Sequence, residues 1–329
     1  MHSAAIIPII IFLSGNMFAG TSSWVEDIFG QVGGDVALNQ IAIPGTHDSA
    51  TDLMTIDSPL SSAQPKIASF IPGVVLRWGL TQDQSVGEQL RGGVRYLDIR
   101  AEHHEGKWMT FHGLISNPLP EVLAEIGEFA TKHPKEIIIV DFQHILGQTK
   151  TLPSLVKMIL NNDSLSKRLA GKNELSVSSN LVDFWQRDKN VILLMTRLQD
   201  LSDESEYLWP RTIENPWSNT RHTTKVIDDL TKQIVNRNTD LLYVSQAVLT
   251  ADPLMMLTGW MRGVPSLKDM AVKWMNPELP SLIPKIAKRA LDVGKNMNIV
   301  IVDFYQHSKI VPLCLDINQK LAASHQQGH

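Results

Sequence analysis

Side chains that could carry out acid–base chemistry follow three strand-like segments of the sequence. Each segment is apolar, or alternates between apolar and polar residues as buried strands do, and each ends where polar residues begin. The carboxyl ends of parallel strands meet on one face of a barrel, so these side chains are expected to gather there. The residues are His47 and Asp48 after residues 41–43, Asp98 and Arg100 at the end of residues 94–100, His112 in the next loop, and Asp303 within residues 298–304.

Two histidines, one arginine and several carboxylates suit displacement at a phosphodiester. One imidazole can take a proton from the attacking hydroxyl while the other protonates the leaving oxygen. A guanidinium matches the phosphoryl oxygens without a metal, and an aspartate bonded to an imidazole fixes its tautomer. Purely structural explanations stay open. His47 and Asp48 could belong to a turn, Asp98 could pair with Arg95 or Arg100, and His112 could be an ordinary loop residue.

The elements that must position these residues alternate between strands and helices. We expect Pro44 and Gly45 to end the first strand. Repetition of strand and helix over most of the chain predicts an α/β fold, namely a TIM-barrel-like parallel β/α barrel that could be irregular or incomplete. A doubly wound open sheet is the alternative, but no glycine-rich phosphate-binding fingerprint follows the first strand. Expected strands cover residues 41–43, 94–100, 136–142, 190–195, 241–244 and 298–304, and the main expected helices cover 82–90, 119–133, 151–160, 165–169, 226–236 and 282–295.

Composition narrows the class of protein. The chain has 329 residues, 43% of them hydrophobic, so it can bury a large core. A net charge of −4 without a basic block gives no reason to expect nucleic-acid binding. Cys314 is the only cysteine, which excludes an intrachain disulfide and a cysteine-based zinc site.

The first residues need separate treatment. Residues 4–13 form a ten-residue apolar run, which has the length of a signal-peptide core and is short for a membrane span, and small residues follow at 19–23. His2 is the only candidate for a basic residue before the run. We expect residues 1–22 to be a signal peptide and residues 23–329 to form a single barrel domain. The expected location is secreted or within the secretory pathway, with no transmembrane span in the mature chain; without cleavage, an anchor or a cytoplasmic protein is the alternative.

Several ordered motifs resemble one known family. IAIPGTHDSA at residues 41–50, VRYLDIR at 94–100, FHG at 111–113 and VDF at 302–304 resemble the X domain of phosphatidylinositol-specific phospholipase C. Residues 78–100 and LDINQKL at 315–321 resemble in particular the small eukaryotic proteins that consist of this domain alone. The resemblance covers almost everything from about residue 24 onward.

The resemblance implies a role for each of the five residues. His47 would be the general base on the inositol 2-hydroxyl, and His112 the general acid toward the diacylglycerol oxygen. Arg100 would hold the phosphate. Asp303 would orient His47, and Asp48 would support His112. The products would be inositol 1,2-cyclic phosphate and diacylglycerol, with slower hydrolysis of the cyclic phosphate as a possible second step.

The resemblance also implies that no metal or other cofactor is needed. In the calcium-dependent signalling enzymes of the superfamily, an acidic calcium ligand stands where Arg100 falls, and asparagine stands where Asp48 falls. A guanidinium cannot ligate a cation. Phe142 falls where a further acidic residue is expected after the third strand, so that carboxylate is in doubt.

The sequence gives weaker indications of the residues that contact the substrate and the membrane. Strand-end position suggests that Arg197 contacts the inositol or its phosphate and that Tyr243 stacks on its ring, although structural roles fit both residues as well. Residues 208–217 and 253–260 could dip into a lipid surface, and core packing explains the second segment equally well. The expected partner is a phosphatidylinositol-type lipid at a membrane surface, bound by a monomer.

Two other functions remain open. A magnesium-dependent phosphodiesterase of the glycerophosphodiesterase or sphingomyelinase D kind would use His47, Asp98 and Glu102 around a cation. Arg100 between those carboxylates weighs against it. A lipid- or inositol-binding protein without turnover is the third hypothesis.

Overall fold

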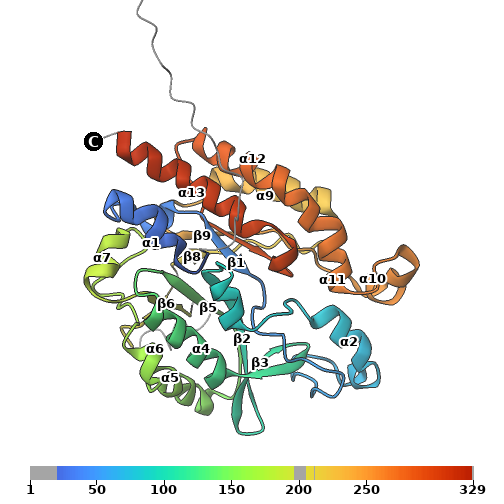
Figure 1. Cartoon of the computed structure of the whole chain (residues 1–329). Helices are drawn as coiled ribbons and strands as arrows, with labels where there is room; N and C mark the ends of the chain where they lie inside the picture. Colours follow the sequence, from blue (N-terminus) through green and yellow to red (C-terminus); the bar gives the residue numbers. More distant parts are fainter. Residues whose placement is uncertain (1–20, 196–204, 211, 328–329) are drawn as a thin grey trace, which may run out of the picture.

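A curved sheet of parallel strands forms the centre of the computed structural model, which describes residues 21–195, 205–210 and 212–327 (Figure 1). The parallel strands lie in the order β7-β6-β5-β2-β1-β10-β9-β8. Among the described residues no pairing joins β7 to β8, so the sheet curls without closing. The predicted TIM-barrel-like fold is confirmed in its incomplete form. These strands are β1 (Ile43–Thr46), β2 (Tyr96–His104), β5 (Ile138–Leu146), β6 (Val191–Leu194), β7 (Leu208–Trp209), β8 (Ile213–Glu214), β9 (Leu242–Gln246) and β10 (Ile299–Val302).

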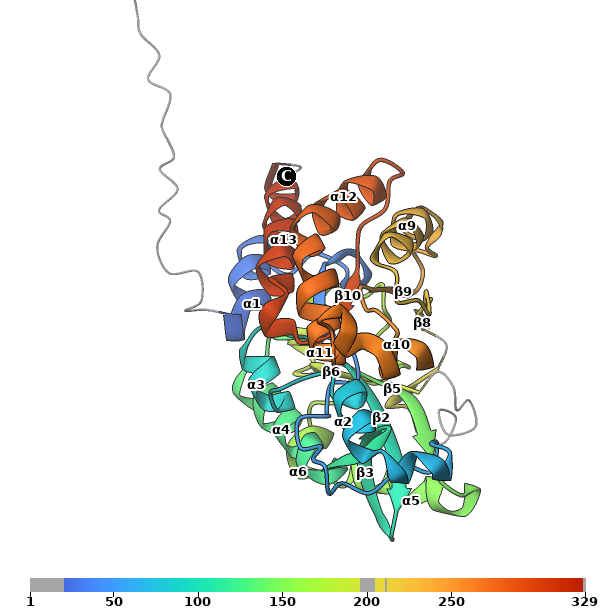
Figure 2. The same ribbon diagram turned by 90° about the vertical axis from the view of Figure 1, so that its right-hand side faces the viewer.

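A hairpin extends the sheet beyond the carboxyl end of β2. Strand β3 (Lys107–His112) pairs antiparallel with the outer half of β2 and with β4 (Leu114–Pro118). Figure 2 shows the β2–β3 hairpin projecting away from the rest of the sheet. The hairpin returns the chain toward the barrel. His112, the last residue of β3, therefore lies close to the parallel strands.

Helices cover the outer face of the sheet. Helix α4 (Leu119–Lys132) buries the apolar stripe that its spacing predicted, and a proline in its first turn fits the helix start. Helix α3 (Val86–Arg91) begins at a capping box between Ser85 and Glu88. The other helices are α1 (Trp24–Phe29), α2 (Pro72–Gly79), α5 (Leu152–Leu160), α6 (Asp163–Ser166), α7 (Leu181–Gln186), α9 (Thr223–Gln233), α10 (Pro253–Thr258), α11 (Leu267–Met270), α12 (Leu279–Leu291) and α13 (Ile310–Gln327).

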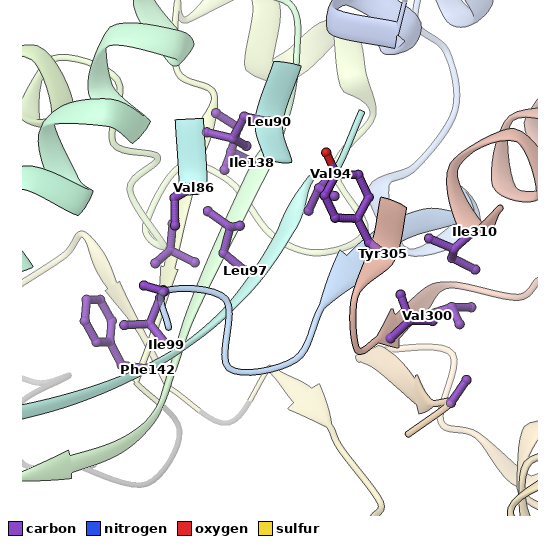
Figure 3. Packing of buried hydrophobic residues seen from close by; sticks show 14 of the residues in the cluster. Val86, Leu90, Val94, Leu97, Ile99, Ile138, Phe142, Val300, Tyr305 and Ile310 are labelled. Atoms are coloured by element: carbon purple, nitrogen blue, oxygen red, sulfur yellow. The ribbon is translucent and has the colours of Figure 1, made fainter. Parts of the chain in front are cut away.

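The core has two layers separated by the sheet. Outward-facing strand residues such as Leu97 and Ile99 pack against the helices, where Val86 and Leu90 of α3 meet them (Figure 3). Inward-facing residues pack with α1, whose Trp24 Nε1 donates to the carbonyl just before β2. Helix α1 therefore covers the amino-terminal end of the barrel interior and leaves the carboxyl ends for the site.

The first strand differs from its expected position. Strand β1 includes Pro44 and Gly45, which were expected to end it, and runs on to Thr46. The Pro44 carbonyl accepts from Arg95 N at 2.8 Å. A Cβ at Gly45 would lie 2.9 Å from the Tyr96 ring, so glycine is there because the neighbouring strand approaches closely. The Pro-Gly pair therefore lies within a strand, where the neighbouring β2 packs closely, and not in a turn.

The predicted signal peptide lies almost wholly outside the described residues. Its cleavage and the single-domain boundary stay predictions. Within the described ranges, no helix is both long enough and apolar enough to cross a membrane.

Candidate active site

The candidate side chains meet at one mouth of the barrel, where β1 and β10 end. Asp98 and Arg100 lie within β2, which continues to His104 instead of ending at residue 100 as expected. Alternate residues of a strand face the same side. In β2 the inward series that includes Tyr96 continues to Asp98 and Arg100, and β1 and β10 continue in the same way to His47 and Asp303. Because these three strands are neighbours in the sheet, their inward side chains meet above the barrel interior.

Asp48 lies at the centre of the group. Its backbone has a left-handed φ of 40°, which breaks the strand alternation and lets it face the mouth together with its neighbour His47. The carboxylate is buried, with Oδ1 at 2.5 Å from Arg100 Nε and Oδ2 at 3.2 Å from His47 Nε2. The same Oδ2 is 3.2 Å from His112 Nε2. Two imidazoles and a guanidinium therefore surround one carboxylate.

Charge keeps Asp48 ionised. Burial alone would raise the pKa of its carboxyl, but Arg100, His112 and His47 together lower that pKa below the ordinary value. The site thus already accommodates one anionic group between its three nitrogen-bearing side chains.

His47 is held from both sides of its ring. Its Nδ1 is 2.9 Å from Asp303 Oδ1, and its Nε2 faces Asp48. Burial lowers the pKa of His47, but the two carboxylates outweigh burial and raise it to about 9. With Asp303 accepting from Nδ1, the proton that His47 can exchange in the mouth is the one on Nε2.

His112 contacts Asp48, as expected, and has a second partner that was not expected. Its Nδ1 is 2.7 Å from the Gly79 carbonyl, which can only accept, so Nδ1 carries a hydrogen and Nε2 faces the mouth. Burial is the main cause that lowers the pKa of His112, and Arg100 adds to it while Asp48 opposes it. The two rings meet edge to face at a centroid distance of 5.8 Å. The orienting partner that sequence reasoning missed is a main-chain carbonyl at the end of α2.

Asp98 faces a second carboxylate that was not expected. Asp141 of β5 lies beside it in register, and Asp141 Oδ2 accepts from Tyr96 Oη at 2.7 Å. Burial and Asp48 raise the pKa of Asp98 to about 7. The doubt about a carboxylate in the third strand arose from aligning Phe142, which faces outward; Asp141, one residue earlier, supplies the carboxylate.

Gln82 also escaped the sequence reasoning. It was assigned to a helix, but it lies before α3 and its buried side chain joins two strand ends. Its Nε2 donates to the Val302 carbonyl at 2.9 Å and to the His47 carbonyl at 3.3 Å. It therefore fixes the backbone from which His47 projects relative to the end of β10. No motif or spacing in the sequence indicated this role.

Three of these residues could offer ligand atoms to a cation. Single atoms of His47, Asp48 and Asp98 lie within 4.8 Å of one another. A cation among them would compete with Arg100 for Asp48, because the guanidinium already contacts that carboxylate. Glu102, the third ligand of the magnesium hypothesis, instead accepts from Ser61 Oγ at 2.5 Å and from the Ser62 amide at 2.9 Å. The donor set of that hypothesis is not assembled, and the prediction of metal independence remains a prediction.

The two expected substrate contacts fare differently from the five residues of the mouth. Arg197 lies outside the described residues. Tyr243 belongs to the outer layer of the core, with its ring 6.0 Å from the guanidinium carbon of Arg237. It lines a separate cavity that none of the five mouth residues lines. Position near a strand end did not indicate which face its side chain would take.

Comparisons with known proteins agree with the motifs. No family model matches the chain. It is 28% identical over 299 residues to PI-PLC X domain-containing protein 3 of Mus musculus, covering 86% of this chain and 89% of that protein. It is also 28% identical over 301 residues to PI-PLC X domain-containing protein 1 of Homo sapiens, covering 87% and 89%.

Solved structures share the fold. The phosphatidylinositol-specific phospholipase C from Listeria monocytogenes superposes with a TM-score of 0.65 at 17% identity, covering 90% of this chain and 98% of that one. A variant of the Staphylococcus aureus enzyme gives 0.63 at 17% identity, covering 93% and 99%. The resemblance that the motifs indicated is confirmed: this chain is a relative of the PI-PLC X domain-containing proteins.

Proposed function

We propose that this chain is a phosphodiesterase that cleaves phosphatidylinositol-type lipids to an inositol 1,2-cyclic phosphate and diacylglycerol, without a metal. The observation that carries the proposal is the convergence of His47 Nε2 and His112 Nε2 on one carboxylate oxygen beside Arg100. A phosphoryl group in this mouth would meet the same three side chains.

Each imidazole then has a distinct task. His47 takes the proton of the attacking inositol hydroxyl on Nε2, while Asp303 at Nδ1 stabilises the imidazolium that forms. His112 gives the proton on its Nε2 to the leaving glycerol oxygen, with its ring fixed by the Gly79 carbonyl. The hydroxyl oxygen attacks phosphorus as the bond to the leaving oxygen breaks, so the inositol phosphate closes into a ring.

Arg100 stabilises the charge on the phosphoryl oxygens. Its guanidinium is a fixed cation with a planar arrangement of donors, and its Nε already lies against the Asp48 carboxylate. Asp48 keeps the guanidinium and the two imidazoles together, and its charge opposes the lowering of the His112 pKa by burial. Because the pKa of His47 is raised and that of His112 is lowered, the reactive form, with His47 neutral and His112 charged, is the minor one at neutral pH. These assignments require no group from outside the chain.

An exposed apolar surface next to the mouth fits a lipid substrate. Ile67 and Phe70 precede α2, and Leu257 and Trp260 lie on α10 and the turn after it; between 64% and 82% of each residue is exposed. We call these four residues the rim surface. A cavity of about 370 Å³ lies between α2, which directly follows Ile67 and Phe70, and the α10 segment, so the two parts of the rim surface are joined through α2. Helix α2 also lies beside α11 in both views (Figures 1 and 2).

The rim surface connects to the chemistry through α2. Gly79, the last residue of α2, supplies the carbonyl that holds His112. Exposed aromatic and aliphatic side chains in one place are typical of membrane contacts. A bilayer that takes up this surface would therefore bring lipid head groups to the mouth. The other segment that was expected to meet lipid, residues 208–217, buries Trp209 and leaves Trp217 exposed.

Phosphorus-31 NMR of the purified protein on phosphatidylinositol vesicles, with and without EDTA, tests the proposal. We expect a cyclic phosphodiester resonance to appear at the same rate in both samples. Loss of turnover in EDTA would support a metal enzyme instead. Vesicle binding with no cyclic product above a His47→Ala control would support a lipid-binding protein without turnover.

A further inference from the structure

A second cavity lies away from the mouth, between the β8–β9 edge of the sheet and α9. Its volume is about 470 Å³, within the range of small-molecule sites, and its wall includes Glu214, Gln233, Asn236, Arg237 and Tyr243. None of the residues proposed for catalysis lines it. Amide, guanidinium and phenol groups in one wall give it a polar character that core packing does not require.

Arg237 is a buried cation that no carboxylate of the described residues contacts in an ion pair, although the charge of Glu214 on the same cavity wall acts on it. Only 2% of the residue is exposed, and its two terminal nitrogens donate to carbonyls, including those of Asn39 at 3.1 Å and Leu241 at 3.3 Å. Among the described residues, no carboxylate forms an ion pair with it, and its Nε has no hydrogen-bond partner. Burial lowers the pKa of Arg237 to about 10, so it is still charged at neutral pH. Glu214 offsets part of this charge without contacting it. A buried guanidinium that lacks a direct partner at Nε is costly unless something else pairs with it.

Tyr243 adds a second donor without a partner. The residue is 3% exposed, and its hydroxyl has no hydrogen-bond partner in the described part of the chain. Burial raises the pKa of Tyr243 to about 12, so the hydroxyl keeps its proton and can donate. The two unpaired donors belong to side chains that touch each other and line the same cavity.

We propose that this cavity binds a small ligand through a carboxylate or phosphate group, whose oxygens accept from Arg237 Nε and Tyr243 Oη. Both donors lack partners in the ligand-free structure, and an oxyanion would satisfy both while neutralising the guanidinium. Because both atoms are covered from solvent without the ligand, binding moves the side chains of the wall and changes the surroundings of the Tyr243 ring.

Glu214 sets a limit on the charge of the ligand. Its carboxylate lines the same cavity, with Oε2 accepting from the Asn238 amide at 3.1 Å. This negative charge opposes an anion, so a monoanion such as acetate should bind more readily than dianionic phosphate. For the same reason, Glu214→Gln should strengthen binding of either anion. Titrations with acetate and with phosphate thus distinguish a ligand that binds through a carboxylate from one that binds through a phosphate group.

Fluorine NMR of protein labelled with 3-fluorotyrosine tests the proposal, because the chain has only four tyrosines. The Tyr243 resonance is assigned by its absence in Tyr243→Phe. Sodium acetate or inorganic phosphate is titrated at constant ionic strength into Arg100→Ala protein, in which anion binding at the mouth is weakened. We expect a saturable shift of the Tyr243 resonance, with a dissociation constant in the millimolar range, and little change at Tyr96 and Tyr305.

Matched variants decide the outcome. Arg237→Lys keeps the positive charge but removes Nε, and should abolish the saturable shift; unchanged positions of the other resonances would show that it folds. If Arg237→Lys does not fold, Glu214→Gln replaces it and should lower the anion concentration at half-saturation. Absence of any saturable shift, an equal shift of all four resonances, or a weaker response in Glu214→Gln would overturn the proposal. None of these results bears on turnover at the mouth.

Discussion

Replacing Asp303 by asparagine should both slow the enzyme and move its pH profile. The carboxylate lies 2.9 Å from His47 Nδ1 and, with Asp48 and Asp98, raises the pKa of this imidazole from 6.5 to about 9. Asparagine keeps the size of the side chain but removes the charge, and its amide can donate to Nδ1. Donation to Nδ1 would leave the hydrogen on Nε2, where the attacking hydroxyl needs a free lone pair.

The magnitude follows from the contacts of His47. Asp303 contributes both charge and a hydrogen bond, so its loss should lower the pKa of His47 by about one pH unit or more, equivalent to roughly 1.4 kcal/mol per unit. Asp48 remains and prevents a complete return to the ordinary value. The pKa of His47 lies above that of His112, so the reactive form, with His47 neutral and His112 charged, is a minor one. Its share is constant between the two pKa values and falls above that of His47. Removing the carboxylate therefore shifts the alkaline limb of the rate profile to lower pH. Loss of the correct tautomer should lower kcat by roughly 10²- to 10⁴-fold.

The assay is kcat/KM against pH for cleavage of phosphatidylinositol in mixed micelles. Asp316→Asn is a suitable control, because this aspartate is exposed on α13 and its ion pair among the described residues is with Lys320 of the same helix. The control should keep the profile of the unmodified chain. An Asp303→Asn enzyme with the same alkaline limb and a rate within a few-fold of the unmodified chain would refute the reasoning about His47.

Two further predictions concern the leaving group and the lipid surface. His112→Ala should lower turnover of phosphatidylinositol by about 100-fold or more. Turnover of a nitrophenyl inositol phosphate should fall much less, because a phenolate of low pKa leaves without a proton. Equal losses on both substrates would argue against the role of His112 as an acid. Phe70→Ala and Trp260→Ala together should weaken sedimentation with phosphatidylinositol vesicles and leave cleavage of that soluble substrate unchanged. Val293→Ala, at an exposed apolar residue outside the rim surface, is the matched control. Equal vesicle binding by the control and by the Phe70→Ala, Trp260→Ala variant would show that the rim surface does not contact the membrane.

The fold was largely predictable because its periodicity is strong. Helix α4 carries a regular apolar stripe, and strands β5 and β10 begin with apolar runs; each lies within a few residues of its predicted place. Strand β1 was displaced because Pro44 and Gly45 usually break strands, and only the approach of Tyr96 from the neighbouring strand explains them. Short-range sequence signals do not contain that contact.

The residues of the site were predictable from the sequence, but some of the hydrogen bonds that hold them in place were not. His47, Asp98 and Arg100 could be placed at one mouth because strand ends were visible in the sequence. The carbonyl of Gly79 and the amide of Gln82 could not be found this way, because their roles depend on how distant segments return to the barrel. Tyr243 was misplaced because the sequence did not fix which residues of a short buried strand face inward.

The central claim is that His47 and His112 act on one phosphate, and a double-mutant comparison of initial rates tests it most directly. Initial rates of cyclic phosphate formation from phosphatidylinositol would be measured for His47→Ala, His112→Ala and the double variant. Groups that act as a unit are strongly non-additive. We expect the initial rate of each single variant to fall about 100-fold or more. The double variant should be little slower than the slower single variant. Near-normal rates in either single variant, or losses that simply multiply, would contradict the central claim.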